Sequence, residues 1–272
     1  MSATISSDGG TLAGTFAACR AEGRAALIPY VTAGHPAPGD TGALLRMLAE
    51  EGADIIELGI PFSDPLADGP TIQLSSFQAI EQGATLEWTL AQLAEFRRDH
   101  STPVVLFTYL NPIFRHGIGR FLRDAVTAGA QGVLVTDLPV GVDAELEDQF
   151  EASGMDLIRL IAPTTLPARV AHIAQAGRGF LYYVSRTGVT GARVELASGL
   201  AAEVAAVRAA TTVPVAVGFG ISTPEQAATV AAVADGVVVG SALVDLLARE
   251  GVEGARPFVR ALRGAVARAA AG

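Results

Sequence analysis

Two patterns of apolar residues alternate along the chain. Short runs rich in valine, isoleucine, leucine and aromatic residues are typical of buried strands, and the longer stretches between them carry apolar residues at helical spacing. Glycine, proline, aspartate or asparagine mark most junctions. The pattern predicts eight strands, at Ala26–Thr32, Asp54–Leu58, Val104–Tyr109, Gly132–Thr136, Leu157–Ile161, Phe180–Val184, Val215–Gly218 and Gly236–Val239. It predicts a helix after each, at Thr41–Glu51, Leu86–Arg98, Ile118–Ala128, Asp143–Ser153, Pro167–Ala176, Ala197–Ala209, Pro224–Val233 and Ala242–Arg249.

This order of elements predicts an α/β fold with parallel strands. Several strands, such as Val104–Phe107, are apolar almost throughout, which is typical of strands buried on both faces. Eight strand–helix units in 272 residues favour a closed (β/α)8 TIM barrel over the alternative, a doubly wound open sheet. A further helix at Thr11–Glu22 is expected to cover the barrel floor. Because no linker or change of composition divides the chain, we expect one domain spanning residues 1–272.

Composition narrows the classes of partner. The chain has 19 basic and 28 acidic residues, a net charge of −9, so nucleic acid is not expected as a partner. The four histidines lack metal-ligand spacing, and the single Cys19 cannot form an internal disulfide. No stretch is typical of a leader peptide or is long and apolar enough for a membrane span. We therefore expect a cytoplasmic protein with no metal and no contact with a membrane.

Two connections that follow strands are longer than a barrel requires. They run from Gly59 to Thr71 after the second strand and from Ser185 to Leu196 after the sixth, whereas such loops usually have about 2 to 6 residues. Active sites of barrel enzymes lie at the carboxyl ends of the strands, where both loops emerge. Both are therefore candidate lids over an active site.

Carboxylates cluster at the same end of the predicted barrel. Glu57 lies in an apolar strand, so it is either a structural residue with buried partners or a general acid/base whose protonation is tuned by burial. Asp68 follows in the next loop and is either a turn residue or a second carboxylate facing the same pocket. Asp137 follows the fourth strand and can orient a loop by hydrogen bonding. Asp54, at the opposite end of its strand, is expected to be structural.

Three glycine-bearing loops predict a phosphate site. They are Gly188–Gly191, Gly218–Ser222 and Gly240–Ala242, after the sixth, seventh and eighth strands. Glycines let backbone N–H groups approach an anion, and a helix that begins at Ser241 directs its positive end towards it. Since the chain contains no lysine, a Schiff-base aldolase mechanism is excluded.

Four motifs together identify a family. They are Pro29–Pro36 (PYVTAGHP), Glu57–Pro70 (ELGIPFSDPLADGP), Ser185–Gly191 (SRTGVTG) and Gly218–Ser222 (GFGIS). They resemble the tryptophan synthase α chain over nearly the whole chain, and the block from Glu57 to Pro70 is highly specific. The resemblance implies a lyase that cleaves indole-3-glycerol phosphate to indole and glyceraldehyde 3-phosphate in tryptophan biosynthesis.

The resemblance also implies roles for particular residues. Glu57 is the expected acid/base at indole C3 and the glyceryl hydroxyl, and Asp68 is expected to stabilise positive charge at the indole N–H. The residues expected to line the indole pocket are Tyr30, Phe107, Tyr109, Leu134, Tyr182 and Phe219. Those expected to bind phosphate are Gly191, Gly220, Gly240 and Ser241. Loop closure is expected to involve Asp137, Arg186 and Thr190, with Thr190 bonded to Asp68 or Asp137 in the closed state.

Family members pair with a β chain, so the resemblance implies an αββα heterotetramer. Pyridoxal phosphate is expected on the partner β chain and no cofactor in this chain, and indole is expected to pass to the partner through a tunnel. The expected contacts are the Pro61–Asp68 loop, Asn111–Pro112 and Pro139. Three alternatives remain open from the residues alone: another phosphate-binding barrel such as a phosphosugar isomerase, a non-catalytic subunit, and a stand-alone indole-releasing lyase.

Overall fold

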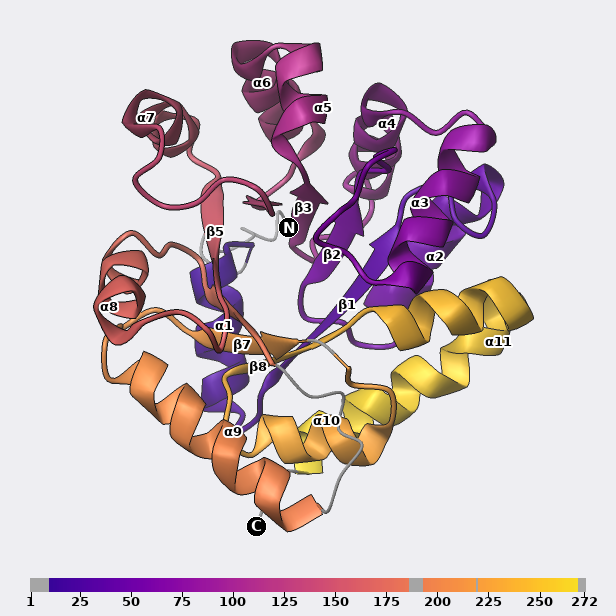
Figure 1. Ribbon diagram of the computed structural model, residues 1–272. Helices are drawn as coiled ribbons and strands as arrows, with labels where there is room; N and C mark the ends of the chain where they lie inside the picture. The colour runs from indigo at the N-terminus through magenta and orange to yellow at the C-terminus, as the bar shows by residue number, and fades with distance from the viewer. Residues whose placement is uncertain (1–9, 186–192, 219, 269–272) are drawn as a thin grey trace, which may run out of the picture.

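The fold is a closed barrel of eight parallel strands (Figure 1). The computed structural model describes residues 10–185, 193–218 and 220–268. Neighbouring strands pair in sequence order and the first pairs with the last, so the predicted TIM barrel is confirmed and the open sheet is excluded. The strands are β1 Ala26–Thr32, β2 Ile56–Gly59, β3 Val104–Thr108, β4 Gly132–Val135, β5 Asp156–Ile161, β6 Leu181–Val184, β7 Val215–Gly218 and β8 Gly236–Val239.

Helices form a ring around the strands in Figure 1. Those at predicted positions are α1 Leu12–Ala21, α2 Thr41–Glu50, α4 Leu86–Phe96, α6 Ile118–Ala128, α7 Ala144–Ala152, α8 Pro167–Gln175, α9 Arg193–Arg208, α10 Pro224–Ala231 and the first part of α11 Ser241–Arg268. Past the predicted end at Arg249, α11 kinks at Gly251, where φ is 69° and ψ −173°, and then continues. Three elements were not predicted: the 3-10 turn η1 Pro38–Asp40, α3 Pro70–Glu81 and α5 Leu110–His116.

The missed helix α3 has an unusual distribution of side chains. Ser75 and Ser76 are buried, whereas Leu74 and Phe77 are more than half exposed. This reverses the pattern by which an amphipathic helix is predicted. The long loop expected after the second strand therefore ends at Gly69, and α3 begins at Pro70, a residue that is favourable at the first position of a helix.

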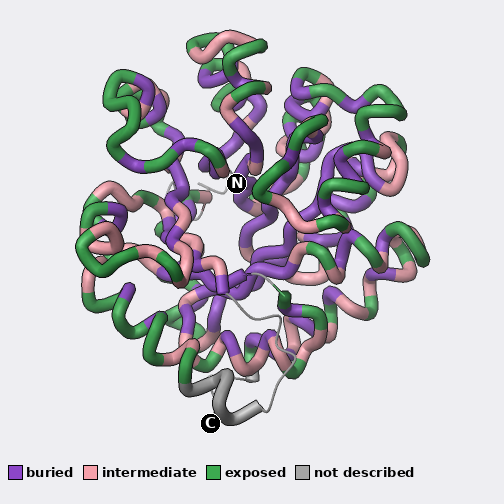
Figure 2. Tube along the Cα trace, viewed as in Figure 1, coloured by how far each residue is buried: buried purple, intermediate pink, exposed green. Residues whose placement is uncertain are grey.

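Helix α1 covers the barrel floor, as predicted. Its Leu12, Phe16 and Cys19 pack with the side chains that fill the barrel interior. Gly132 and Gly236, at the amino ends of β4 and β8, make room for this helix, since a Cβ at either would lie 3.1 Å from Leu12 or Phe16. Buried positions follow the strands and the inner sides of the helices (Figure 2). With the amino end filled, a ligand can approach only from the carboxyl ends of the strands.

Asp54 lies at the floor and is structural, as expected. Its carboxylate accepts hydrogen bonds from the Arg24 guanidinium at 2.7 and 2.8 Å and from the Leu27 N–H at 2.8 Å. These bonds join the amino ends of β1 and β2. Asp54 precedes β2 and lies three residues before Glu57, and it bonds to groups at the amino ends of the strands, whereas Glu57 projects into the barrel.

Candidate active site

Glu57 is the second residue of β2 and projects into the barrel. Its neighbours Ile56 and Leu58 pack in the core between strands and helices, so strand alternation turns Glu57 inward. The side chain has no exposed surface, and neither carboxyl oxygen has a hydrogen-bond partner among the residues that the structure describes. Burial raises the pKa of Glu57 to about 8. A carboxyl group in this state is protonated at neutral pH and can donate its proton to a bound molecule.

Two tyrosines approach Glu57 from different strands. Tyr30 pairs with Glu57 across β1 and β2, and Tyr182 lies on β6. Burial raises the pKa of both phenols far above the usual range, and the charges of Asp68 and Glu57 raise it further. Glu57, Asp68 and both phenols therefore lie close enough for their charges to interact.

Glycines on neighbouring strands make room for the two phenol groups. A Cβ at Gly59 would lie 2.3 Å from the Tyr30 hydroxyl oxygen, and a Cβ at Gly218 would lie 2.2 Å from that of Tyr182. Each hydroxyl therefore lies directly over a strand glycine, where no other residue fits without displacing the ring. Gly218 was included in a predicted phosphate loop, but its described contact is with Tyr182.

Asp68 is held over the site by Tyr109. The Tyr109 hydroxyl donates a 2.8 Å hydrogen bond to the Asp68 carboxylate and accepts one of 3.1 Å from the Ala67 N–H. Burial raises the pKa of Asp68, and the bond from Tyr109 acts in the opposite direction. Gln73 of α3 donates to the Asp68 carbonyl at 2.9 Å, which fixes the loop backbone to the helix. The interpretation of Asp68 as a second carboxylate at the pocket thus has a geometric basis.

The structure describes five of the six residues expected to line the indole pocket, and they lie in or next to the barrel interior. Tyr30 and Phe107 meet edge to face with ring centroids 5.2 Å apart. Phe107 is the register partner of Leu134 on β4, and both pack with the barrel interior, as Tyr182 does. Tyr109 contacts Asp68 through its hydroxyl group. The ring of Phe62 packs against the Tyr109 ring, with the two centroids 5.2 Å apart. Phe219 lies outside the described residues.

The described part of the expected phosphate site follows β7 and β8. Gly220 has a φ of 75°, a left-handed conformation that favours glycine. Gly240 directly precedes α11, which begins at Ser241. A Cβ at Gly240 would lie 3.5 Å from Tyr30, so the start of α11 is next to the pocket that contains Glu57. The first N–H groups of a helix lack partners within it and attract anions. Gly191 lies outside the described residues.

Asp137 takes part in a structural contact at the same rim. Its carboxylate accepts a 2.7 Å hydrogen bond from the Leu110 N–H, which fixes the start of α5 next to Tyr109. This is consistent with the expectation that Asp137 orients a loop. Arg186 and Thr190 lie outside the described residues, so their expected part in loop closure stays a prediction.

Three polar residues at the site were missed from the sequence. Thr32 and Ser75 are buried and join β1 to α3 by a 2.7 Å hydrogen bond, and Gln73 binds the loop that carries Asp68. The signal that could have revealed them is the helix itself, since recognising α3 at Pro70 places Gln73 and Ser75 in its first two turns.

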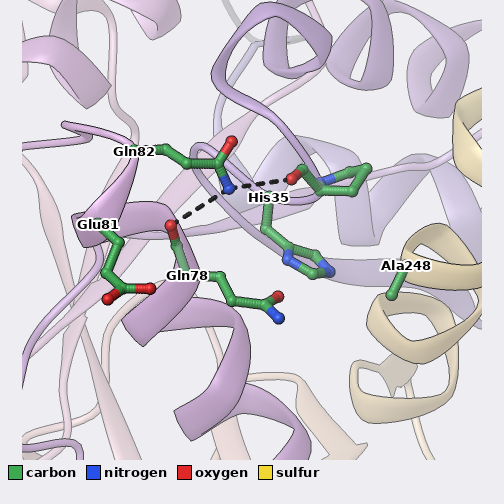
Figure 3. Close-up of a pocket in the computed structure, with 6 residues that line it drawn as sticks. His35, Gln78, Glu81, Gln82 and Ala248 are labelled. Atoms are coloured by element: carbon green, nitrogen blue, oxygen red, sulfur yellow. Dashed lines mark hydrogen bonds between the residues drawn. The ribbon is translucent and has the colours of Figure 1, made fainter.

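A separate cavity of about 300 Å³ lies between α3 and α11. In Figure 3 the His35 imidazole lies between the side chains of Gln78 and Ala248. Its Nε2 donates a 3.4 Å hydrogen bond to the Val244 carbonyl, and burial lowers its pKa. None of the residues predicted for the active site lines this cavity, so it is distinct from the pocket at Glu57.

The described ranges contain neither a candidate metal site nor a candidate membrane span. No group of three or more histidine, cysteine, aspartate or glutamate residues there could hold a metal ion. Nor does any described helix combine the length and apolar character that crossing a membrane requires.

Comparison with known proteins identifies strong similarities over almost the full chain. The family model described as "Tryptophan synthase alpha chain" matches residues 16–267. Proteins of that name from Geobacter sulfurreducens and Rhizorhabdus wittichii are 51% and 48% identical, over 94% and 95% of this chain and 98% and 97% of theirs. A Mycobacterium tuberculosis tryptophan synthase structure has a TM-score of 0.86 at 40% identity, covering 94% of this chain and 97% of that chain. The alpha subunit from Legionella pneumophila has the same TM-score and coverage at 36% identity.

Proposed function

The chain belongs to the tryptophan synthase alpha chain family, and on that premise we propose how its residues carry out the family's reaction. The activity itself follows from membership: the chain is a lyase that performs the α reaction of tryptophan biosynthesis, cleaving indole-3-glycerol phosphate to indole and glyceraldehyde 3-phosphate. Family membership also favours this reaction over the alternatives of a phosphosugar isomerase and a non-catalytic subunit.

Glu57 is the general acid and then the general base of this reaction. Protonated Glu57 gives its proton to indole C3, which converts the ring into an electron-accepting indolenine. The resulting carboxylate takes the proton of the glyceryl hydroxyl, the carbon–carbon bond breaks, and its electron pair returns to the ring as the aldehyde forms. Glu57 ends protonated, so no other acid is consumed. The raised pKa of the buried carboxyl supports the first step.

Asp68 stabilises the intermediate. Protonation at C3 places positive charge on the indole nitrogen, and an ionised carboxylate next to the N–H lowers the energy of that state. The hydrogen bond from Tyr109 supports this role because it favours the ionised form of Asp68. The two carboxylates thus act in opposite protonation states, a division that their different surroundings support.

Binding of the substrate is divided between an apolar pocket and a phosphate site. We assign the indole ring to the aromatic wall that includes Tyr30, Phe107 and Tyr182, supported by the edge-to-face contact and the packing described above. The phosphate is assigned to Gly220, Gly240 and the start of α11 at Ser241. Backbone donors and a helix end explain how a chain with a net charge of −9 holds a dianion.

The observation that carries the proposal is the buried, unpartnered carboxyl of Glu57 at the open end of the barrel. The rate of indole release by Glu57→Gln tests it, because the amide has no acidic proton to deliver to C3 and cannot act as the base. Glu57→Gln is expected to slow cleavage by about 100-fold or more. Unchanged cleavage by Glu57→Gln would overturn the assignment.

Alpha chains of this family work with a beta chain, and we propose an αββα heterotetramer in which pyridoxal phosphate is held by the β chain and indole passes directly to it. Exposed apolar side chains around the active-site rim support a docking face there. Leu66 is 90% exposed, and Leu74, Phe77 and Phe114 are each more than half exposed. The mass of the complex formed with a β chain tests the stoichiometry: four chains are expected, and a two-chain complex would contradict it.

We further propose that residues 1–272 act as one domain in the cytoplasm. The pairing of all eight strands in one barrel supports the first point. The single cysteine, buried and free among the described residues, supports a reducing compartment. Limited proteolysis and cell fractionation test the two points separately.

A further inference from the structure

A glutamine in the first turn of α3 holds the loop that carries Asp68. The Gln73 side-chain amide donates hydrogen bonds to the Asp68 carbonyl at 2.9 Å and to the Pro65 carbonyl at 3.4 Å. The Asp68 N–H itself donates to the Pro65 carbonyl at 3.0 Å, which closes a turn of four residues. Gln73 therefore bonds to the first and the last residue of this turn.

The part of α3 that contains Gln73 is anchored to the barrel independently of the loop. Ile72 is buried in a cluster with Tyr30 of β1. Ser75, also buried, forms a 2.7 Å hydrogen bond with Thr32 of the same strand. Gln73 thus extends from a segment fixed on both sides to β1, and its two bonds hold the turn in a defined position relative to the barrel.

Asp68 is restrained at two points by two different elements. Tyr109, at the end of β3, binds the Asp68 carboxylate at 2.8 Å, and Gln73 binds the Asp68 backbone carbonyl. Tyr109 therefore acts on the group that ionises, whereas Gln73 acts only on where the residue lies. Position matters here, because a carboxylate stabilises a developing charge best when it is already held next to the atom that becomes charged.

We propose that Gln73 is a positioning residue for the lyase reaction: by holding the Pro65–Asp68 turn against α3, it keeps the Asp68 carboxylate next to the N–H of the bound indole ring. The proposal rests on the role of Asp68 given above, and Gln73 needs no contact with the substrate for this effect. Because Gln73 is exposed, water can replace the turn as its partner. The two bonds are therefore expected to contribute little to stability and to act chiefly on position.

Steady-state kinetics of Gln73→Met in the full chain tests this role. Methionine resembles glutamine in length and helix propensity and adds no charge, but it has no N–H to donate. Since Asp68 stabilises a charge that forms only during the reaction, kcat and kcat/KM are expected to fall together, about two- to tenfold, with KM little changed. A kcat equal to that of wild type would overturn the proposal, as would a rise in KM at unchanged kcat.

Two further variants separate this role from a general effect on α3. The amide of Gln82, at the other end of the helix, donates to the carbonyls of Pro36 and Gln78 at 3.3 and 3.2 Å (Figure 3). Gln82→Met is therefore the matched control and is expected to keep the wild-type kcat. Gln73→His keeps a nitrogen donor at the same number of bonds from Cα and is expected to restore kcat to within about twofold of wild type. An equal fall in Gln82→Met, or no recovery in Gln73→His, would contradict the proposal.

A double-mutant cycle tests whether Gln73 acts through Asp68. Asp68→Asn is expected to slow cleavage, measured in a single turnover with excess enzyme. In that background Gln73→Met is expected to slow it no further, because the carboxylate that Gln73 positions is already absent. A second loss as large as that in the wild-type background would overturn the proposal. If instead Asp68→Asn retains full activity, the role of Asp68 itself fails, which distinguishes the two failures.

Discussion

At the scale of single residues, the fold stabilises one protonation state of a carboxyl group. Glu57 is fully buried without a partner, so folding favours its neutral form and shifts its pKa from about 4.5 to about 8. This condition could be anticipated, since a glutamate in an apolar strand must be neutral, paired or functional. The hydrogen bond between Thr32 and Ser75 could not be predicted, because the two residues are 43 positions apart and nothing in the sequence indicates that they are in contact.

Stability of Glu57→Gln as a function of pH tests this condition. The unfolded carboxyl ionises near its ordinary pKa and the folded one only near pH 8, so the folded state binds more protons between these values. Wild type therefore loses stability as pH rises through this window, whereas the amide does not titrate. The melting temperature of Glu57→Gln relative to wild type is expected to rise from pH 5 to pH 8 and then level off. A constant difference across that range would contradict the burial effect.

The role proposed for Asp68 requires its ionised form, the opposite of the state required of Glu57. Its ionised form is favoured by the Tyr109 hydroxyl and opposed by burial, so activity is expected to fall as pH drops through its pKa. In Tyr109→Phe that pKa rises, and the acidic midpoint of kcat is expected to move up by about 0.5 to 1 pH unit. Tyr183→Phe, which removes a hydroxyl bonded to Glu203 of α9, is the matched control and is expected to leave the midpoint unchanged. Equal profiles in the two variants would refute the role of Tyr109.

At the scale of elements, the strands of the barrel could be predicted from local sequence patterns, whereas helices α3 and α5 at its rim could not. The boundaries of β1, β7, β8 and α6 match the predicted ones. The three strands are buried at every position, and glycine or proline marks most of the ends of these four elements. Helix α3 escaped prediction because serines occupy its buried face and Leu74 and Phe77 its exposed face. In this reversed arrangement Ser75 bonds to Thr32 of β1, and the apolar Leu74 and Phe77 stay exposed.

The floor helix α1 makes a structural prediction. Leu12 is fully buried against the barrel interior, so Leu12→Ala is expected to lower the free energy of unfolding by about 2 to 5 kcal/mol, measured by denaturant titration. Leu166→Ala changes a leucine that is 73% exposed and is expected to have a much smaller effect. KM is expected to remain unchanged in both, since α1 lies at the opposite end from Glu57. A large rise in KM for Leu12→Ala would show that the floor shapes the pocket.

At the scale of the whole molecule, charge and exposed apolar surface have separate consequences. The net charge of −9 disfavours association with polyanions, so the proposed phosphate site needs local backbone donors, which we assign to the loops after β7 and β8. The exposed Leu66, Leu74 and Phe77 lie on the loop and helix that also carry Asp68 and Gln73. A β chain docked there would contact the segment that carries Asp68, the proposed second carboxylate, and would thereby couple partner binding to catalysis.

Phe77→Ser tests the docking face. Truncating an exposed aromatic anchor is expected to weaken binding of a β chain about tenfold or more, measured by calorimetry, with the activity of the free chain little changed. Val126→Ser, on the outer surface of α6, is the matched control and is expected to bind normally. Normal binding by Phe77→Ser would place the β chain on another surface.

The most direct measurement is the release of indole from indole-3-glycerol phosphate by the purified chain, alone and with a β chain, with Glu57→Gln as the control. A partnered lyase whose acid is Glu57 predicts weak activity alone, a strong rise with the β chain, and loss of activity in Glu57→Gln under both conditions. High activity of the chain alone would indicate a stand-alone lyase. Indole release by Glu57→Gln at the wild-type rate would contradict the central claim that this buried carboxyl carries the reaction.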